Sequence, residues 1–246
     1  MTTEWGGKAP DGSDIITATI GSQKLQATII SFGACLQDLR LQHFDFPLVI
    51  GYADVTDYIS NTSYFGAVVG RNANRIAQGR CLLNGQQLHL TKAANNHHQL
   101  HGGPNGSTFR NWQLVSKTPN QIVLQDILPH GHMGFPGNLC VQITYTITQQ
   151  TLDVKIEAYA DQTTLCNFML HNYFNLDDSL NLDHHFLSVA ATTYLPTNES
   201  GIPIGNEASL VNTDYDYRTM KRLNKFIIER SLDRDLCANS SHGLIV

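Results

Sequence analysis

The stretch of residues 141–159, VQITYTITQQTLDVKIEAY, decides the fold class. Apolar and polar residues alternate up to Ile147, and the alternation returns from Leu152 after the polar pair Gln149-Gln150. Because successive side chains of a strand point to opposite faces, a period of two predicts a strand with one buried face. We therefore expect two antiparallel strands here, joined by a tight turn and each exposed to solvent on one face.

The same strand pattern recurs through the rest of the chain. Residues 14–20 and 24–32 are both predicted strands. Residues 80–90 are predicted to form a hairpin, because Asn84-Gly85 tolerates the positive φ angles of a tight primed turn.

Helical signals are few and short. Residues 54–61 indicate a short turn of helix, and residues 223–232 carry apolar residues among charges. No repeat, low-complexity tract or Pro/Ser-rich linker divides the chain. We therefore expect a mainly β protein, a large antiparallel β-sandwich that forms a single domain over residues 1–246.

Composition narrows the classes of function. A chain of 246 residues with 41% hydrophobic content can bury a core. The net charge of −5 and the scattered 16 Lys and Arg residues argue against a nucleic-acid partner. Five widely spaced cysteines without a CxxC pair predict reduced thiols rather than disulfides or a zinc site. With no signal peptide and no apolar run of membrane length, we expect a cytoplasmic protein that does not contact membranes.

The stretch HNYFNL, residues 171–176, follows a predicted strand at residues 164–170. His171 would then lie at a strand end, near the polar Asn167 and in front of an aromatic pair. A histidine can exchange a proton near neutral pH because its ordinary pKa is about 6.5. This stretch alone is also compatible with a packed core histidine. Whether His171 is catalytic or structural must therefore be judged from other segments of the chain.

A glycine-rich segment at residues 66–80 contains Asn74 and Arg75. Arginine offers a rigid fork of donors and asparagine both a donor and an acceptor, which together suit adjacent hydroxyls of a sugar. Alternatively, Arg71, Arg75 and Arg80 are surface charges or bind loop carbonyls.

The segment at residues 95–106 places His97, His98 and His101 within five positions. A metal site is disfavoured, because neighbouring positions on an extended chain point to opposite faces and no cysteine lies near. The two glycines after His101 instead predict a sharp turn that leaves this imidazole exposed at a cleft floor.

Two further loops, residues 132–139 and 213–218, combine polar groups with aromatic rings. Sugar sites have this composition, because a sugar carries apolar C–H patches beside its hydroxyls.

In their order and spacing these motifs resemble the aldose 1-epimerase, or galactose mutarotase, family. The motifs that carry the resemblance are FGA at 32–34, GRNANRI at 70–76, LHGG at 100–103, GFPGN at 134–138, HNYFNL at 171–176, IPIG at 202–205 and DYR at 216–218. The resemblance implies a β-sandwich of the mutarotase type, no cofactor and no metal. It also implies interconversion of the α and β anomers of a free aldohexose such as glucose or galactose.

The resemblance further implies roles for single residues. His171 matches the family histidine that protonates the ring oxygen, and His101 would assist there or hold a hydroxyl. The residues implied to bind sugar hydroxyls are Asn74, Arg75, Asn172, Tyr173 and Asp216.

The sequence departs from the family at its end. Family chains carry the general base in a Glu-Thr-Gln-like motif near their C-terminus, and no such motif occurs here. We therefore expect a shortened family domain that lacks the C-terminal part. Two functions stay open: an active epimerase, and a non-catalytic sugar-binding protein without the base. A third, an enzyme acting on a hexose 6-phosphate, should carry further cationic groups for the phosphate.

Overall fold

The computed structural model describes residues 3–60, 62–223 and 235–238, and the chain divides into two compact units. The first unit is Met1–Asn175 and the second is Leu176–Val246. No helix among the described residues is long and apolar enough to cross a membrane.

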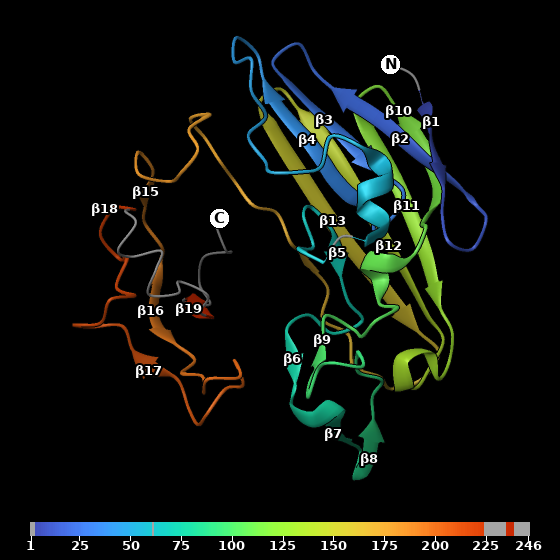
Figure 1. Cartoon of the computed structure of the whole chain (residues 1–246), viewed down its shortest axis with the longest axis vertical. Helices are drawn as coiled ribbons and strands as arrows, with labels where there is room; N and C mark the ends of the chain where they lie inside the picture. Colours follow the sequence, from blue (N-terminus) through green and yellow to red (C-terminus); the bar gives the residue numbers. More distant parts are fainter. Residues whose placement is uncertain (1–2, 61, 224–234, 239–246) are drawn as a thin grey trace. The chain divides into compact units, whose positions relative to one another are not determined.

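The first sheet of the first unit has four antiparallel strands in chain order (Figure 1). They are β1 (Thr3–Lys8), β2 (Asp14–Gly21), β3 (Leu25–Ile30) and β4 (Cys35–Leu41). The two strands predicted at residues 14–20 and 24–32 are confirmed as β2 and β3, with boundaries shifted by one or two residues at most.

The second sheet also has four antiparallel strands in chain order. They are β10 (Gln113–Thr118), β11 (Gln121–Leu128), β12 (Leu139–Thr148) and β13 (Thr151–Ala160). The alternating stretch forms β12 and β13, with Val141 opposite Ala158, so the predicted hairpin is confirmed.

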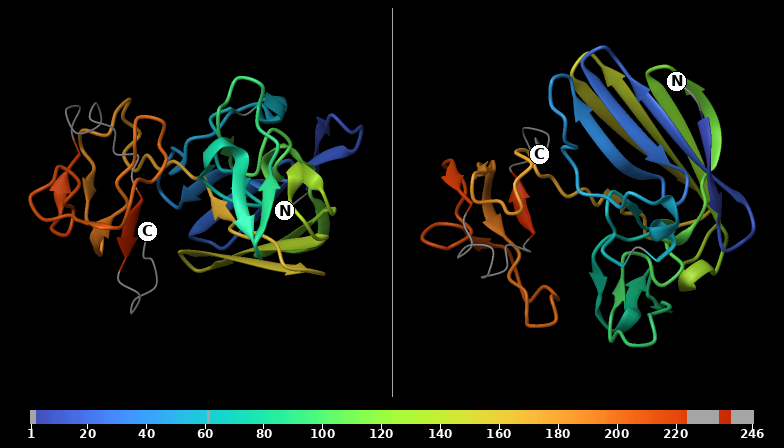
Figure 2. Two further views of the ribbon diagram at one scale, coloured as in Figure 1. Left: turned by 90° about the horizontal axis from the view of Figure 1, so that it is seen from below. Right: turned by 45° about the horizontal axis from the view of Figure 1, so that its top comes forward.

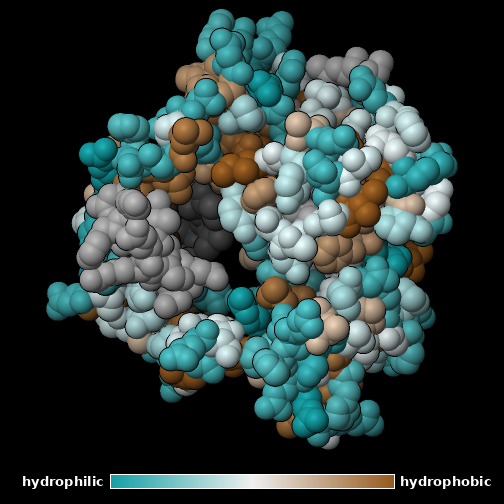
Figure 3. Space-filling model, viewed as in Figure 1, coloured by the Kyte–Doolittle hydropathy of each residue, from teal (hydrophilic) through white to brown (hydrophobic). Residues whose placement is uncertain are grey.

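The two sheets lie face to face as two layers (Figure 2) and share one apolar core. Ile20 and Ile29 of the first sheet and Val141 and Ile143 of the second are fully buried in the same cluster. Each such side chain stabilises the fold by about 1.5–3 kcal/mol relative to an exposed position. On the visible face of this unit, hydrophilic and intermediate residues predominate (Figure 3), as the outward half of the alternation requires. The mainly β sandwich is therefore confirmed.

Short strand pairs and 3-10 turns connect the sheets. The pairs are β5 (Val68–Val69) with β14 (Met169–Leu170), β6 (Arg75–Ile76) with β9 (Gln99–Leu100), and β7 (Arg80–Leu83) with β8 (Gln86–His89). The 3-10 turns are η1 (Val55–Ser60), η2 (Ala77–Gly79), η3 (Ser107–Phe109) and η4 (His132–Gly134). The predicted hairpin at residues 80–90 is confirmed as β7–β8, and the predicted helical turn at 54–61 as η1.

The strand predicted at residues 164–170 is wrong over most of its length. Only Met169–Leu170 forms a strand, because Asn167 instead pairs with the loop around Arg71. The Asn167 N–H donates to the Arg71 carbonyl and the Asn167 carbonyl accepts from Ala73, at 2.8 and 2.7 Å. The helical prediction at residues 223–232 lies outside the described residues, apart from Leu223.

Within residues 176–223 and 235–238, the second unit forms short strands. They are β15 (Phe186–Leu187), β16 (Ala191–Tyr194), β17 (Ala208–Ser209), β18 (Lys221–Arg222) and β19 (Leu236–Ala238). β15 pairs with β18, and β16 lies between β17 and β19.

Candidate active site

The short strand pairs of the first unit deliver two histidines to one place. His171 follows β14 directly and His101 follows β9 directly. The His171 backbone is held on both sides, because its N–H donates to the Ala67 carbonyl over 2.9 Å and its carbonyl accepts from Gly66 over 3.1 Å. The imidazole centroids of His101 and His171 lie 5.1 Å apart, with the ring planes perpendicular at 90°.

His101 is locked to Asn74 by two hydrogen bonds. The His101 N–H donates to the Asn74 carbonyl over 3.1 Å. In return the Asn74 N–H donates to Nδ1 of His101, also over 3.1 Å. An accepting Nδ1 carries no proton, so the neutral imidazole holds its proton on Nε2.

The surroundings of His101 keep it neutral. Burial, together with the nearby His171 and Arg75, lowers the pKa of His101 to about 3. At neutral pH His101 is therefore a neutral donor through Nε2–H. The prediction that it is exposed at a cleft floor is wrong, because only 8% of its surface is accessible.

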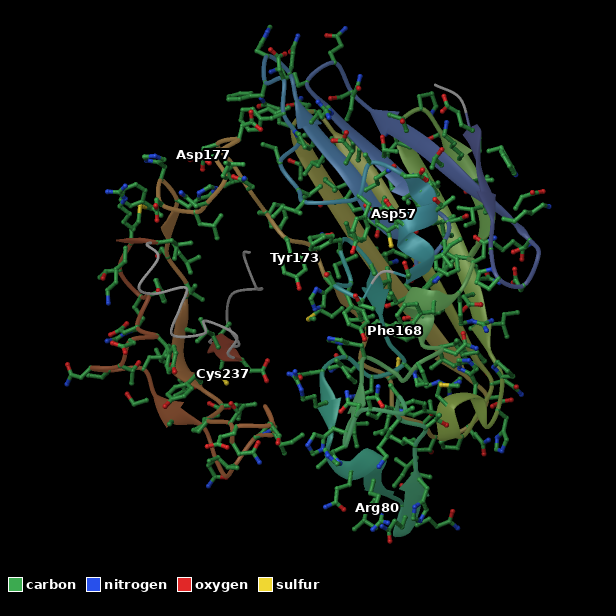
Figure 4. All side chains as sticks on the ribbon, viewed as in Figure 1. Asp57, Arg80, Phe168, Tyr173, Asp177 and Cys237 are labelled. Carbon is green, nitrogen blue, oxygen red and sulfur yellow. The ribbon has the colours of Figure 1, made fainter. Side chains whose placement is uncertain are left out.

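The buried position of His101 follows from the glycine behind it. A Cβ on Gly102 would lie 1.8 Å from the Gly70 carbonyl oxygen, and φ at Gly102 is +86°. The sharp turn was expected, but its effect is that the loop presses against Gly70 and encloses the imidazole. Gly70 is itself covered by Phe168 (labelled in Figure 4), whose ring would lie 2.2 Å from an added Cβ.

Tyrosine rings surround the two imidazoles. The Tyr64 ring centroid lies 4.7 Å from that of His101 and 5.6 Å from that of His171. Tyr173 (labelled in Figure 4) contacts His171 at 5.1 Å and is 39% exposed. Sequence reasoning missed Tyr64. The one signal that could have found it is its place just before Gly66, where the glycine-rich segment begins.

Three residues of this site have backbone angles that side chains seldom adopt. The φ values are +59° at Tyr64, +60° at Asn74 and +51° at His101. Positive φ at non-glycine residues costs about 1–3 kcal/mol each and gathers at functional sites. Holding these three side chains in place therefore lowers the free energy of unfolding.

Asn74 and Arg75 form one polar group beside His101. The Asn74 Oδ1 accepts from the Arg75 N–H over 2.8 Å and from Arg75 Nη1 over 3.3 Å. Both side chains are half-buried. The remaining donors of the Arg75 fork suit vicinal hydroxyls.

Asn172 brings an acceptor that the described residues leave unused. Its Oδ1 is buried, yet no described residue donates a hydrogen bond to it. A buried polar atom without a partner costs about 1–3 kcal/mol. A hydroxyl of a bound ligand would remove this cost if the Asn172 amide turned toward it.

Arg71 does not belong to the ligand-binding group. Its side chain is 2% exposed and donates to the carbonyls of Pro136, Gly137 and Leu128 at 2.7–3.0 Å. For Arg71, therefore, the alternative that the arginines bind loop carbonyls is correct, and Arg80 is a surface charge.

Asp216 lies in the second unit, where Arg218 engages both of its carboxylate oxygens at 2.8 and 2.7 Å. The Arg218 guanidinium lowers the pKa of Asp216 to about 2. A sugar hydroxyl would have to share this carboxylate with Arg218. The role of Asp216 in binding the sugar therefore stays a prediction. The other six predicted residues all lie in the first unit.

No group of three His, Cys, Asp or Glu side chains among the described residues could hold a metal ion. His97 is exposed, and Nδ1 of His98 accepts from the Gln78 N–H over 3.0 Å.

Comparison with known proteins gives a consistent result. The family model described as aldose 1-epimerase matches residues 14–246. The galactose mutarotases of Rattus norvegicus and Homo sapiens are 34% and 35% identical to this chain, over 96% of it and 74% of their own length. The aldose 1-epimerase of Escherichia coli is 32% identical over 90% of this chain and 65% of its own length. The chain thus spans about three quarters of the mammalian relatives.

Solved structures agree on the fold. An aldose epimerase homologue from C. elegans superposes with a TM-score of 0.82 and 28% identity, over 91% of this chain and 72% of its own. A galactose 1-epimerase from Lactobacillus acidophilus superposes with a TM-score of 0.86 and 24% identity, over 99% and 76%.

Proposed function

The chain belongs to the aldose 1-epimerase family, and from that premise we propose that it interconverts the α and β anomers of free aldohexoses such as glucose and galactose. The observation that carries the proposal is the perpendicular pair of imidazoles, His101 and His171, whose centroids lie 5.1 Å apart beside the rings of Tyr64 and Tyr173. No cofactor enters the chemistry.

In the proposed reaction His171 is the general acid. It gives a proton to the ring oxygen while the C1–O5 bond breaks, and a base removes the proton of the C1 hydroxyl, so that an open aldehyde forms. Rotation about C1–C2 and the reverse transfers close the ring with the other configuration. Positioned acid–base catalysis contributes about 10²–10⁴-fold in rate.

His101 has a different part in this scheme. As a neutral imidazole with its proton on Nε2, it donates a hydrogen bond to the ring oxygen or a hydroxyl without becoming a second acid. Asn74 and Arg75 bind neighbouring hydroxyls, and Asn172 accepts from one. Tyr173 offers a ring face to the C–H patches of the sugar.

The second proton transfer needs a base on the other side of C1. The family resemblance assigns this step to a glutamate. An activity assay tests whether this chain supplies such a base. The assay is polarimetry on freshly dissolved α-D-glucose and α-D-galactose. The wild type is compared with His171→Ala and with His97→Ala, a control at an exposed histidine.

We expect wild type and His97→Ala to accelerate mutarotation, and His171→Ala to lose about 10²–10⁴-fold of this acceleration. A folded wild type that binds sugar without accelerating the reaction would overturn the enzymatic proposal in favour of the sugar-binding alternative. Activity retained in His171→Ala would show that another group is the acid.

We also propose a reducing, cytoplasmic setting for the protein. The five cysteines are unpaired, and burial raises the pKa of the Cys35 thiol, which keeps it protonated. Thiol titration of protein purified without reductant tests this, since five free thiols are expected and disulfides would contradict it.

A further inference from the structure

The first unit contains a cavity of about 260 Å³ whose lining includes none of the residues assigned to catalysis or sugar binding above. It lies between the β1–β2 turn, the segment after β3 and the turn around η3. The side chains that give it its chemistry are Asp11, Phe32, Asn105, Phe109 and Arg110. Its volume is below the roughly 300–1,000 Å³ of sites for drug-sized ligands, so it suits a single small ring.

Arg110 presents a fixed donor to this cavity. Its Nε and Nη2 donate to the two oxygens of Asp126 at 2.5 and 2.9 Å. Nη2 also donates to the Ile127 carbonyl over 3.2 Å. Among the described residues Nη1 has no acceptor, so the guanidinium is held rigidly with one edge available.

Asp11 and Asn105 complement that donor. The Asp11 Oδ1 accepts from the Ser13 N–H and Oγ at 3.0 and 2.5 Å, while its second oxygen has no donor among the described residues. The exposed Asn105 amide likewise makes no side-chain hydrogen bond within the described chain, and it can both donate and accept. The lining therefore offers donors and acceptors together.

The charge balance disfavours an anionic ligand. Arg110 is paired with Asp126, and Asp11 adds a second carboxylate close enough to raise the pKa of Arg110 together with Asp126. An anion entering the cavity would meet the Asp11 carboxylate without an unpaired cation to offset it. The partly buried Phe109 adds apolar surface, which suits the C–H face of a sugar ring, whereas Phe32 is only 1% exposed and packs behind the lining.

We propose that this cavity is a second binding site, for a neutral monosaccharide or a polyol of similar size. Phe109 lines this cavity, and its ring centroid lies 6.0 Å from that of Tyr64, which contacts both imidazoles. NMR signals of Phe109 would therefore shift when a ligand binds at either site. The test must follow the NMR signals of Arg110 and Asn105 instead.

The test is a titration of ¹⁵N-labelled protein with methyl β-D-galactopyranoside, followed by NMR. This glycoside cannot open its ring and is not turned over. We expect saturable shifts of the Arg110 Nε–H and the Asn105 side-chain amide, with a dissociation constant on the order of millimolar. Inorganic phosphate, as the second probe, should leave both signals unchanged.

Asn105→Tyr places a ring across the cavity and should remove the Arg110 shift. Asn95→Tyr, at an exposed asparagine outside the lining, is the matched control and should keep it. Asp11→Asn is a second variant that retains the Oδ1 acceptor for Ser13 while removing the charge. It should weaken the Arg110 shift without disturbing the turn.

Three results would each overturn the proposal. In the first, the Arg110 Nε–H signal does not shift while the signals of the catalytic site reach saturation with the glycoside. In the second, phosphate shifts the Arg110 signal more strongly than the glycoside does. In the third, the glycoside still shifts the Arg110 signal in both Asn105→Tyr and Asp11→Asn. Because the glycoside is not a substrate, the result does not depend on epimerase activity. His171→Ala should show the same Arg110 shift as wild type.

Discussion

The backbone N–H of Asn74 donates to Nδ1 of His101 over 3.1 Å, and this contact sets the state of the second histidine. It places the proton of the neutral imidazole on Nε2, and burial beside His171 and Arg75 lowers the pKa of His101 to about 3. The two neighbouring imidazoles therefore need not compete for the same proton. In the proposed reaction His171 is the acid, while His101 keeps its Nε2 proton and donates a hydrogen bond.

The depressed pKa of His101 predicts a loss of stability in acid. In the unfolded chain the imidazole titrates near 6.5, whereas in the folded chain it stays neutral down to about 3. Below pH 6.5 the unfolded state binds more protons, so the stability that is fully present above this pH is lost as pH falls toward 3. The loss is about 1.4 kcal/mol for each pH unit in this window.

Urea unfolding of wild type and His101→Gln at pH 7.5 and pH 5 measures this contribution. Between these values wild type should lose about 2 kcal/mol more of its free energy of unfolding than the variant, which cannot titrate at this position. Equal losses in the two proteins would show that His101 titrates normally in the folded state.

Tyr64 should matter through its ring and not through its hydroxyl. Because the ring shields both His101 and His171, we expect Tyr64→Ala to admit water, raise the pKa of His101 toward its ordinary value and lower kcat about 10–100-fold. Tyr64→Phe keeps the ring and should stay within a few-fold of wild type. Polarimetry gives the rates, and ¹⁵N NMR of the imidazoles gives the pKa; a Tyr64→Ala variant with an unchanged His101 pKa would contradict the shielding.

Arg71 should be one of the most sensitive positions for stability. Arg71→Met leaves the buried carbonyls of Leu128, Pro136 and Gly137 without their charged donor, at about 3–5 kcal/mol of free energy of unfolding. Arg80→Met changes an exposed side chain and should cost less than about 0.5 kcal/mol. Urea denaturation measures both, and similar midpoints for the two variants would refute the anchoring role.

Alanine substitutions at Gly102 and Gly85 distinguish the cost of a steric clash from the cost of a positive φ angle. Both have positive φ, +86° and +78°, but a Cβ on Gly102 would lie 1.8 Å from the Gly70 carbonyl oxygen, whereas one on Gly85 meets nothing within 4 Å. Gly85→Ala should cost about 1–2 kcal/mol. Gly102→Ala should cost several kcal/mol more and displace His101. Thermal unfolding and polarimetry test this, and equal costs would mean that the loop can move away.

The alternation in residues 141–159 was sufficient to predict β12 and β13, because a strand with one wet face needs only local information. The Asn84-Gly85 turn was sufficient for the β7–β8 hairpin for the same reason. Residues 164–170 failed because their partner is remote. Asn167 bonds to Arg71 and Ala73, and only contact across the fold could show that this pairing replaces a regular strand.

The sequence by itself determined the fold class and the family and named six candidate site residues of the first unit, since motifs and periodicity are properties of the chain. The tertiary structure decided how these residues work. It buried His101 through the contact of Gly102 with Gly70, decided that Arg71 binds buried carbonyls rather than lying on the surface, and placed Tyr64 against both imidazoles. These outcomes depend on distances between segments far apart in the chain, and burial and pKa follow from those distances.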